Sequence, residues 1–300
     1  MIQIKKIIEL TGHSGAVYAL EQSETENCFY SGSGDKIVAK WDLESLSAEN
    51  FSAQFPGIVY SLCFLKEKNV LLAGTSEGKV HVLDLAGKKE IKILQNHAQP
   101  VFDLKHSAKN ILSCGSDGTL SIISSEDFTA KKIIKLCNGK LRAIDIYENE
   151  AAIACGDGVI RVIDLENLKL QCEFPAHKDS VYAVKFSPDG KYILSGGKDA
   201  HLNKWKMENG KWSMEKSIPA HNYAVYSIVF SPDGKLFATA SRDKTIKIWD
   251  SNTFEILTRI NKENSEGHIN SVNKLLWSNY KNFLISTGDD RKIMVWEVAK

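Results

Sequence analysis

The chain repeats one pattern at intervals of 40 to 47 residues, and this repetition constrains its fold more than any other feature. One slot is acidic in every repeat: Asp35, Glu77, Asp117, Asp157, Asp199, Asp243 and Asp290. A second, apolar slot recurs in the same register: Val17, Val59, Val101, Leu141, Val181, Val225 and Val272. Two independent anchors therefore divide the 300 residues into seven repeats, and a period of this length indicates a repeat architecture.

Each repeat is predicted to form four short strands. In the sixth repeat "VYSIVFS" is apolar and β-branched, and "SPDG" (231–234) fits a type I turn. "KLFATAS", a tight turn and the alternating "IKIWD" follow, and a weaker strand comes last. Four strands per repeat are typical of a propeller blade. We therefore predict an all-β fold, a seven-bladed β-propeller of four-stranded antiparallel blades, as a single domain over residues 1–300.

Over its whole length the chain resembles the WD-repeat (WD40-type) β-propeller family. The resemblance rests on the Gly-His pairs at 12–13 and 267–268, and on the Trp-Asp pairs at 41–42 and 249–250, in register with the repeats. The last repeat ends after three strands, at "MVWEVAK", and a surplus strand, "IQIKKIIEL", precedes the first repeat. We expect residues 2–10 to complete the seventh blade and close the ring, because closure removes exposed sheet edges.

A histidine slot lies four residues before the apolar anchor, and a hydroxyl residue accompanies the histidine wherever it is present. In the second and fourth repeats Phe55 and Cys137 replace the histidine, and Ala73 and Ile153 replace the hydroxyl residue. This joint loss indicates that the two side chains touch, and we expect these two blades to depend mainly on apolar packing.

The family resemblance implies a hydrogen-bonded tetrad in which the Trp indole meets the hydroxyl, the hydroxyl meets the His, and the His meets the Asp. Full sets are His13, Ser31, Asp35, Trp41; His177, Ser195, Asp199, Trp205; His221, Thr239, Asp243, Trp249; and His268, Ser286, Asp290, Trp296. The third repeat has Ile123 in the tryptophan position. Because buried polar groups need partners, we interpret the tetrads as structural.

Serine, histidine and aspartate together also suggest a hydrolytic triad. Repetition argues against that reading, because an enzyme needs one site and the chain would have several. The eight histidines show no HExxH motif and no Cys/His spacing typical of a metal site. We predict no catalytic residues, no metal and no cofactor.

The first strand of each repeat has an aromatic or polar residue at its second position: Tyr18, Tyr60, Phe102, Arg142, Tyr182, Tyr226 and Asn273. Its flanking apolar residues lie three apart, which a β-bulge would reconcile. The resemblance implies that the second position rims the central channel. This aromatic bias has two readings: strand propensity, or an aromatic-lined binding surface.

Charged residues of neighbouring slots are expected at the same rim: Lys140, Lys198, Arg242 and Asp289. With Arg142, the three basic residues would form an arc over adjacent blades. Such an arc beside aromatic rings suits an acidic or phosphorylated peptide, although surface lysines and arginines are often merely solvated.

Composition limits the remaining classes of function. The net charge of +1 argues against a nucleic-acid binder, and no apolar run approaches the roughly 20 residues of a membrane span. Six cysteines without a CxxC pair favour buried free thiols in a reducing compartment, so we expect a cytoplasmic location.

The sequence therefore predicts a non-catalytic scaffold, a monomeric propeller that binds a peptide segment or a protein loop. Alternatives are an adaptor subunit of a larger assembly, such as a ubiquitin ligase or a signalling complex, and a channel-site enzyme or small-molecule binder. In the ubiquitin-ligase class a basic residue tends to lie two positions after the Trp-Asp aspartate. Glu44 and Asn252 occupy these positions and argue against that class.

Overall fold

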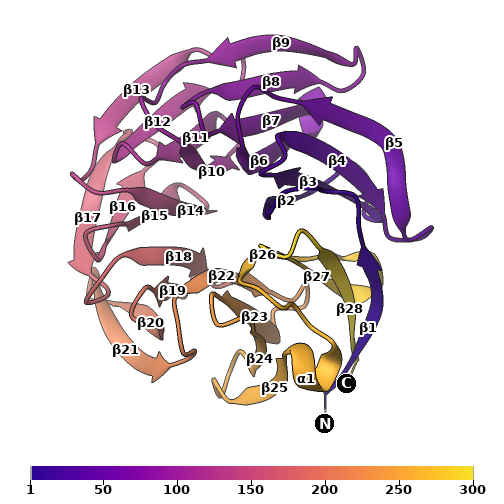
Figure 1. The fold of residues 1–300 in the computed structure, drawn as a ribbon. Coiled ribbons are helices and arrows are strands. Elements are labelled where there is room, and N and C mark those ends of the chain that lie inside the picture. The colour runs from indigo at the N-terminus through magenta and orange to yellow at the C-terminus, as the bar shows by residue number, and fades with distance from the viewer. Residues whose placement is uncertain (1, 300) are drawn as a thin grey trace. The chain divides into compact units, whose positions relative to one another are not determined.

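The computed structural model describes residues 2–299, which form seven four-stranded antiparallel sheets (Figure 1). This arrangement confirms the predicted fold class in its strand content and its number of blades. The chain divides into two compact units. Unit 1 contains the residues up to Val59 and those from His221 onward, and unit 2 is Tyr60–Ala220.

Unit 1 contains the first, sixth and seventh blades. The first blade is β2 (Val17–Gln22), β3 (Cys28–Ser33), β4 (Ile37–Asp42) and β5 (Ser47–Gln54). The sixth blade is β22 (Val225–Phe230), β23 (Leu236–Ser241), β24 (Ile246–Asp250) and β25 (Ile256–Ile260). The seventh blade is β26 (Val272–Trp277), β27 (Phe283–Gly288), β28 (Ile293–Ala299) and β1 (Gln3–Leu10). A short helix, α1 (Lys262–Ser265), and a 3₁₀ turn, η2 (Tyr280–Asn282), lie in the connections.

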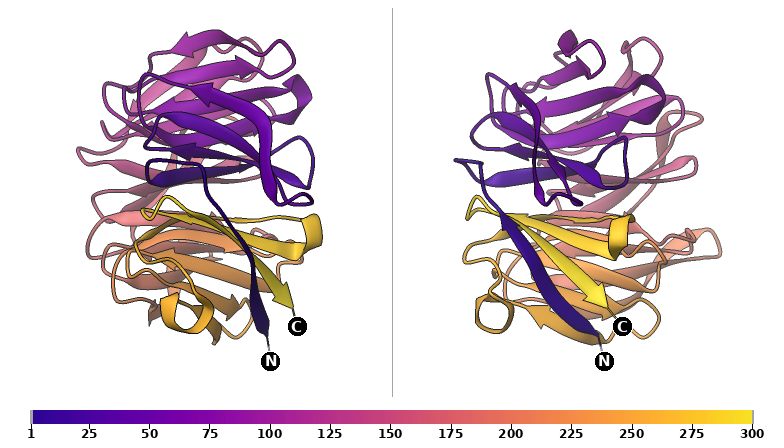
Figure 2. Two further views of the ribbon diagram at one scale, coloured as in Figure 1. Left: turned by 45° about the vertical axis from the view of Figure 1, so that its right-hand side comes forward. Right: turned by 90° about the vertical axis from the view of Figure 1, so that its right-hand side faces the viewer.

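The N-terminal strand completes the last blade, as predicted. β1 pairs antiparallel with β28, from Gln3 opposite Ala299 to Leu10 opposite Ile293. Both views of Figure 2 show the indigo β1 running along the yellow β28. The buried Leu10 packs in an apolar cluster with Val17. The pairing therefore covers the backbone edge that β28 would otherwise expose.

Unit 2 contains the second to fifth blades, apart from Val59, the first residue of the second blade, which belongs to unit 1. The second blade is β6 (Val59–Leu65), β7 (Val70–Thr75), β8 (Val80–Asp84) and β9 (Lys89–Leu94), with a 3₁₀ turn, η1 (Lys66–Lys68). The third blade is β10 (Val101–His106), β11 (Asn110–Gly115), β12 (Thr119–Ser124) and β13 (Ala130–Lys135). The fourth blade is β14 (Leu141–Tyr147), β15 (Glu150–Cys155), β16 (Val159–Asp164) and β17 (Lys169–Pro175). The fifth blade is β18 (Val181–Phe186), β19 (Tyr192–Gly197), β20 (His201–Glu208) and β21 (Lys211–Pro219).

The second strand of a blade is its most buried element. Every residue of β7 and of β11 is buried, because both faces of these strands are covered. In unit 2 the apolar clusters lie between successive blades, and one of them joins Leu72 of the second blade to Leu104 of the third. A strand that is covered on both faces has a continuous apolar sequence instead of alternating polar and apolar residues, and this accounts for the sequence "VLLAGT" of β7.

The predicted bulge is present in the first strand of the blades. In β10 the pairing register shifts between Val101 and Asp103, which leaves Phe102 out of the ladder. The same shift follows the first residue of β2, β14, β18, β22 and β26. A bulge re-aims the extra side chain, so it determines where the second-position residues point.

Candidate functional site

The structure brings together the four residues of each predicted tetrad. In the sixth blade the Nε2 atom of His221 lies 2.8 Å from the Oγ1 atom of Thr239, and its Nδ1 atom lies 3.1 Å from Asp243. The indole of Trp249 donates to the same Thr239 oxygen at 2.9 Å. The sets built on His13, His177 and His268 repeat these contacts at 2.7 to 2.9 Å.

Burial determines which groups donate and which accept hydrogen bonds in the tetrad. It lowers the pKa of His221, so the imidazole is neutral near pH 7. Burial alone would raise the pKa of Asp243, but the hydrogen bonds that it accepts from His221, Thr245 and Asn222 together outweigh burial and hold this pKa below its usual range. The Nδ1–H group of His221 therefore donates to the carboxylate, and its Nε2 atom accepts from the Thr239 hydroxyl. Every polar atom in this buried chain has a partner, as a stabilising network requires.

The aspartate of the tetrad also organises the turn in which it lies. Asp243 accepts from the backbone N–H groups of Asn222 at 2.9 Å and Thr245 at 3.0 Å. The intervening Lys244 has a φ of 72°, in the left-handed region. These bonds to the turn give the carboxylate a structural task, in agreement with the structural reading of the sets.

The blades that lack a full tetrad differ from one another. In the third blade His97 bonds Ser113 at 2.8 Å and Thr119 at 2.9 Å. In the second blade Phe55 is buried in the histidine slot. In the fourth blade Cys137 packs in an apolar cluster with Leu141 and Ile153, as expected, and its thiol donates to the backbone carbonyl of Gly139 at 3.3 Å.

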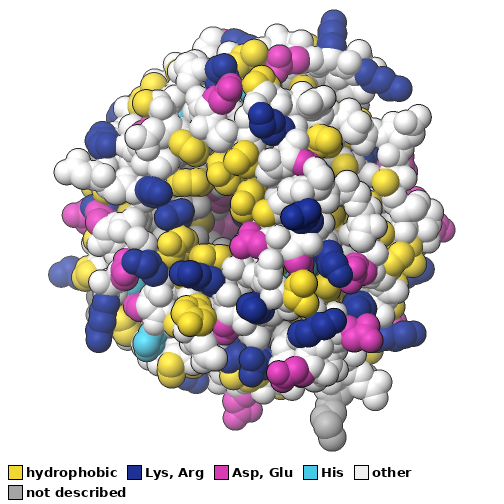
Figure 3. All heavy atoms as spheres, in the orientation of Figure 1, with side chains coloured by type: hydrophobic (Ala, Val, Ile, Leu, Met, Phe, Trp, Pro, Cys, Tyr) yellow, Lys and Arg dark blue, Asp and Glu magenta, His cyan; other side chains and the backbone are white. Residues whose placement is uncertain are grey.

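Four second-position residues of unit 2 form a continuous stacked row, which we call the aromatic–arginine row: Tyr60, Phe102, Arg142 and Tyr182. The rings of Tyr60 and Phe102 meet edge to face with 5.6 Å between their centroids. The Arg142 guanidinium carbon lies 5.0 Å from the Phe102 centroid and 4.6 Å from that of Tyr182. All four side chains are partly exposed. Over β10, β14 and β18, the face seen in Figure 3 carries hydrophobic side chains next to lysines and arginines.

Arg142 is incompletely satisfied within this row. Its Nε atom is buried and has no hydrogen-bond partner among residues 2–299. Two aromatic faces hold the planar guanidinium, which has a fixed fork of donors that suits carboxylates and phosphates. The ammonium group of Lys140 lies 5.9 Å from the Phe102 centroid and adds a second positive charge.

Lys198 contributes less positive charge than the sequence suggests. Its ammonium group pairs with the carboxylate of Asp179 at 2.9 Å, and both side chains are about half exposed. The hydrogen bond from this pair raises the pKa of Lys198. The predicted basic arc is therefore partly neutralised at this position.

Unit 1 holds the other predicted rim residues. Asn273 donates to Asp289 at 2.8 Å and to the carbonyl of Val17 at 3.2 Å. The guanidinium of Arg242 lies 5.7 Å from the ring centroid of Tyr223. The remaining two, Tyr18 and Tyr226, are partly exposed at the bulges of β2 and β22. The structure thus pairs Asn273 with Asp289 and places an exposed aromatic ring beside Arg242.

Sequence reasoning missed two buried aspartates beneath the row. Asp103 accepts from the backbone N–H of Ile144 at 2.9 Å, which joins β10 to β14. Asp145 accepts from the ammonium of Lys185 at 2.7 Å and from the N–H of Phe186 at 2.8 Å, which joins β14 to β18. The sequence did contain a sign of these contacts, because each aspartate lies within the otherwise apolar first strand of its blade. These bonds lock together three of the strands that carry the row.

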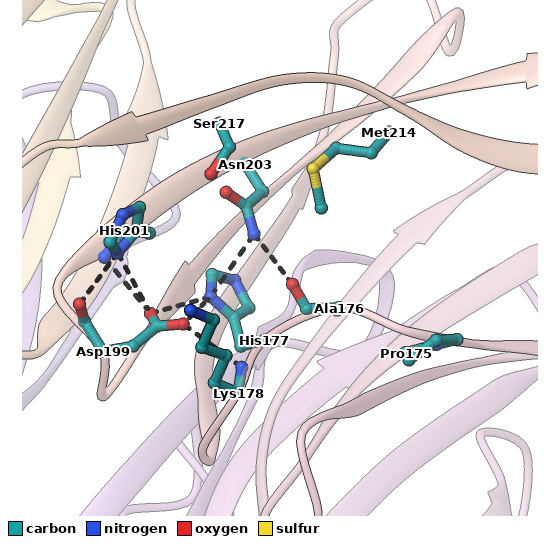
Figure 4. A pocket seen from close by; sticks show the side chains of 9 residues that line it. All are labelled: Pro175, Ala176, His177, Lys178, Asp199, His201, Asn203, Met214 and Ser217. Atoms are coloured by element: carbon teal, nitrogen blue, oxygen red, sulfur yellow. Dashed lines mark hydrogen bonds and ion pairs between the residues drawn. The ribbon is translucent and has the colours of Figure 1, made fainter.

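A pocket of about 380 Å³ beside the tetrad of the fifth blade was also missed (Figure 4). His177 and Asp199 of the tetrad line it together with His201 and Met214. Asn203 also lines it and donates to the carbonyl of Ala176 at 2.7 Å. The Oδ1 atom of Asn203 is buried and accepts no hydrogen bond from the residues that the structure describes.

No helix within residues 2–299 has the length and apolar character needed to cross a membrane.

Comparison with known proteins gives one matching family model, WD40, described as "WD domain, G-beta repeat". It matches residues 4–42, 88–124, 168–206, 212–250 and 261–297. These five segments cover more than half of the chain.

Several characterised proteins are similar over a part of their length. U3 small nucleolar RNA-associated protein 21 of Saccharomyces cerevisiae is 26% identical over 200 residues, 62% of this chain and 20% of that protein. Autophagy-related protein 16 of Arabidopsis thaliana is 22% identical over 192 residues, 62% of this chain and 38% of that protein. Transcription factor unc-37 of Caenorhabditis elegans is 23% identical over 203 residues, 62% of this chain and 31% of that protein. The chain thus spans less than two fifths of the length of each.

Proposed function

Because the chain belongs to the WD40 repeat family, we propose that it is a non-catalytic protein–protein interaction scaffold. The aromatic–arginine row of unit 2 is the proposed site, and a peptide segment or protein loop is the proposed ligand. The proposal includes one domain over residues 1–300, a monomeric state and a cytoplasmic location, which remain predictions.

The environment of Arg142 is the observation that carries this proposal. Its guanidinium is stacked between Phe102 and Tyr182, yet its buried Nε atom has no partner in the described part of the chain. An unmade hydrogen bond at a buried donor costs about 1–3 kcal/mol. Because that atom is shielded from solvent, a ligand carboxylate or phosphate would accept from the terminal N–H groups of the partly exposed side chain, and the held guanidinium would lose little entropy on binding.

The aromatic members of the row supply contact area. Tyrosine and phenylalanine bury large surfaces with few rotatable bonds, and such residues dominate the energetics of protein interfaces. The strands beneath Phe102, Arg142 and Tyr182 are joined through Asp103 and Asp145, so the row is rigid before it binds. A preorganised surface binds more tightly than one that must be ordered.

The charges near the row favour an acidic or phosphorylated segment. Arg142 and Lys140 both lie against the ring of Phe102. Lys198 has its own carboxylate partner and is expected to influence the rate of association more than the affinity.

A displayed library of random peptides tests the proposal. Panning on the intact protein should enrich sequences with Asp or Glu beside apolar residues. Binding of the enriched peptides should fall at least tenfold with Arg142→Gln and with Tyr182→Ala. The matched control is Lys211→Gln, which removes an exposed charge on the outer strand β21.

Two further measurements separate the contributions. Raising the salt concentration should weaken binding of wild type more than binding of Arg142→Gln, because screening acts on the charge that the variant lacks. Circular dichroism verifies that each variant is folded. Enriched peptides that bind the two row variants as tightly as they bind wild type would show that the row is not the site.

A further inference from the structure

Two cysteines of the fourth blade lie side by side in a position that the other blades use for histidine. Cys137 occupies the histidine slot, and Cys155 ends β15. The two sulfur atoms and a carboxylate oxygen of Asp157 all lie within 4.8 Å of one another. Both cysteines are buried, and Cys137 is 9% exposed whereas Cys155 is 0% exposed.

Neighbouring blades show why a side chain at the Cys155 position must face the slot. Glycine occupies this position in the third and fifth blades, as Gly115 and Gly197. A Cβ atom added at Gly115 would lie 2.8 Å from the Nδ1 atom of His97, and at Gly197 it would lie 2.3 Å from that of His177. A side chain would therefore crowd the histidine in these two blades, whereas the first and sixth blades hold the small residues Ser33 and Ser241 at this position. Cys137 is smaller than histidine, and this leaves room for Cys155.

Arg161 and the two thiols form one electrostatic group. The guanidinium pairs with Asp157 at 2.9 Å and with Glu173 at 2.9 Å, and its positive charge favours the ionised form of both thiols. The neighbouring Cys155 thiol lowers the pKa of Cys137 to about 6, and the neighbouring Cys137 thiol, together with burial, raises the pKa of Cys155. Cys137 is thus the more acidic and the more exposed of the two thiols, so it is the one that a peroxide meets first.

We propose that Cys137 and Cys155 are a reactive dithiol pair that a peroxide oxidises to an intramolecular disulfide. The Cys137 sulfur attacks one peroxide oxygen, the O–O bond breaks, and the departing oxygen leaves as water after protonation. The resulting sulfenic acid is attacked by the Cys155 sulfur, which loses its proton, and the S–O bond breaks to release a second water. Two thiols lose two protons and two electrons, and one hydrogen peroxide becomes two waters. This inference stands apart from the proposed peptide site.

The test uses the reduced full-length chain and hydrogen peroxide. Free thiols are blocked with iodoacetamide after exposure, and the digest is analysed by mass spectrometry. Trypsin places Cys137 and Cys155 in different peptides. We expect these peptides to be joined, with a mass loss of about 2 Da for the two hydrogens removed. A reductant should separate them again.

Cys172→Ser is the matched control. Cys172 is more exposed than Cys137, but burial and the charge of Glu150 raise its pKa. The control should therefore form the Cys137–Cys155 link as wild type does. Cys155→Ala should abolish the link and slow the oxidation of Cys137, because it removes the thiol that lowers the Cys137 pKa. Dimedone traps the Cys137 sulfenic acid that forms, and circular dichroism tests folding.

The linkage map of wild type decides the matter even if a variant fails to fold. Full alkylation of both cysteines after peroxide treatment, or a disulfide that joins other cysteines, would overturn the proposal. In a second experiment the reduced protein is incubated with Zn²⁺ alone and examined by native mass spectrometry. One tightly bound ion that protects both thiols from peroxide would also overturn the proposal. The two cysteines would then be assigned to a metal site in which the ion displaces the Arg161 contacts.

Discussion

Replacing His221 by alanine isolates the contribution of one tetrad. His221 bonds Thr239 at 2.8 Å and Asp243 at 3.1 Å, and both His221 and Thr239 are buried. The substitution leaves the Thr239 hydroxyl without its acceptor, which costs about 1–3 kcal/mol. Asp243 keeps its backbone donors from Asn222 and Thr245, so its loss is smaller. The vacated space adds a cavity term, and we expect a total loss of about 2–4 kcal/mol in the free energy of unfolding.

A double-mutant cycle attributes this loss to the hydrogen bond rather than to the cavity. Thr239→Val removes the hydroxyl and keeps the shape, so it is paired with His221→Ala. Unfolding is followed in urea by tryptophan fluorescence and circular dichroism. Because both single changes break the same bond, the double variant should be at least about 0.5 kcal/mol more stable than the sum of the single losses predicts.

Cys137→Ala provides the comparison within the same slot. Its thiol donates a weak hydrogen bond to the Gly139 carbonyl, whereas the imidazole of His221 bridges a hydroxyl and a carboxylate, so the loss should be smaller than that of His221→Ala. Equal losses for the two variants, together with strict additivity in the cycle, would refute the view that the polar network stabilises the blade.

Three further outcomes are expected. Deletion of residues 1–10 should lower the free energy of unfolding by several kcal/mol, because it exposes the edge of β28, and an unchanged melting temperature would contradict this. Burial lowers the pKa of His177 and His221, so the unfolded chain takes up protons first and stability should fall as the pH drops below about 6.5; a melting temperature that is flat between pH 8 and 5 would argue against it. Asp145→Ala removes the acceptor that joins β14 to β18 and should cost about 1–3 kcal/mol in urea unfolding, with Asp145→Asn intermediate; a loss below 0.5 kcal/mol would exclude this role.

The sequence by itself determined the number of blades, the pairing of the terminal strands and the members of each tetrad. These features follow from short sequence segments or from the spacing of the repeats. The spacing of the acidic slots counts the repeats, and the surplus strand at residues 2–10 matches the strand missing after Trp296. The joint loss of the histidine and the hydroxyl residue identified a contact, because a buried polar group is kept only with its partner. The three-residue spacing of apolar positions similarly predicted the bulge.

Only the tertiary structure decided how side chains from different repeats meet. The stacking of Arg142 between Phe102 and Tyr182 joins residues 40 positions apart on either side, and no pattern within one repeat specifies it. The sequence shows Lys198 as a charge but not the Asp179 that neutralises it. The residue types in the repeat slots predicted which side chains lie at the rim. Partner, burial and charge state depend on the directions that neighbouring backbones give to their Cβ atoms, and these directions exist only after the blades have packed.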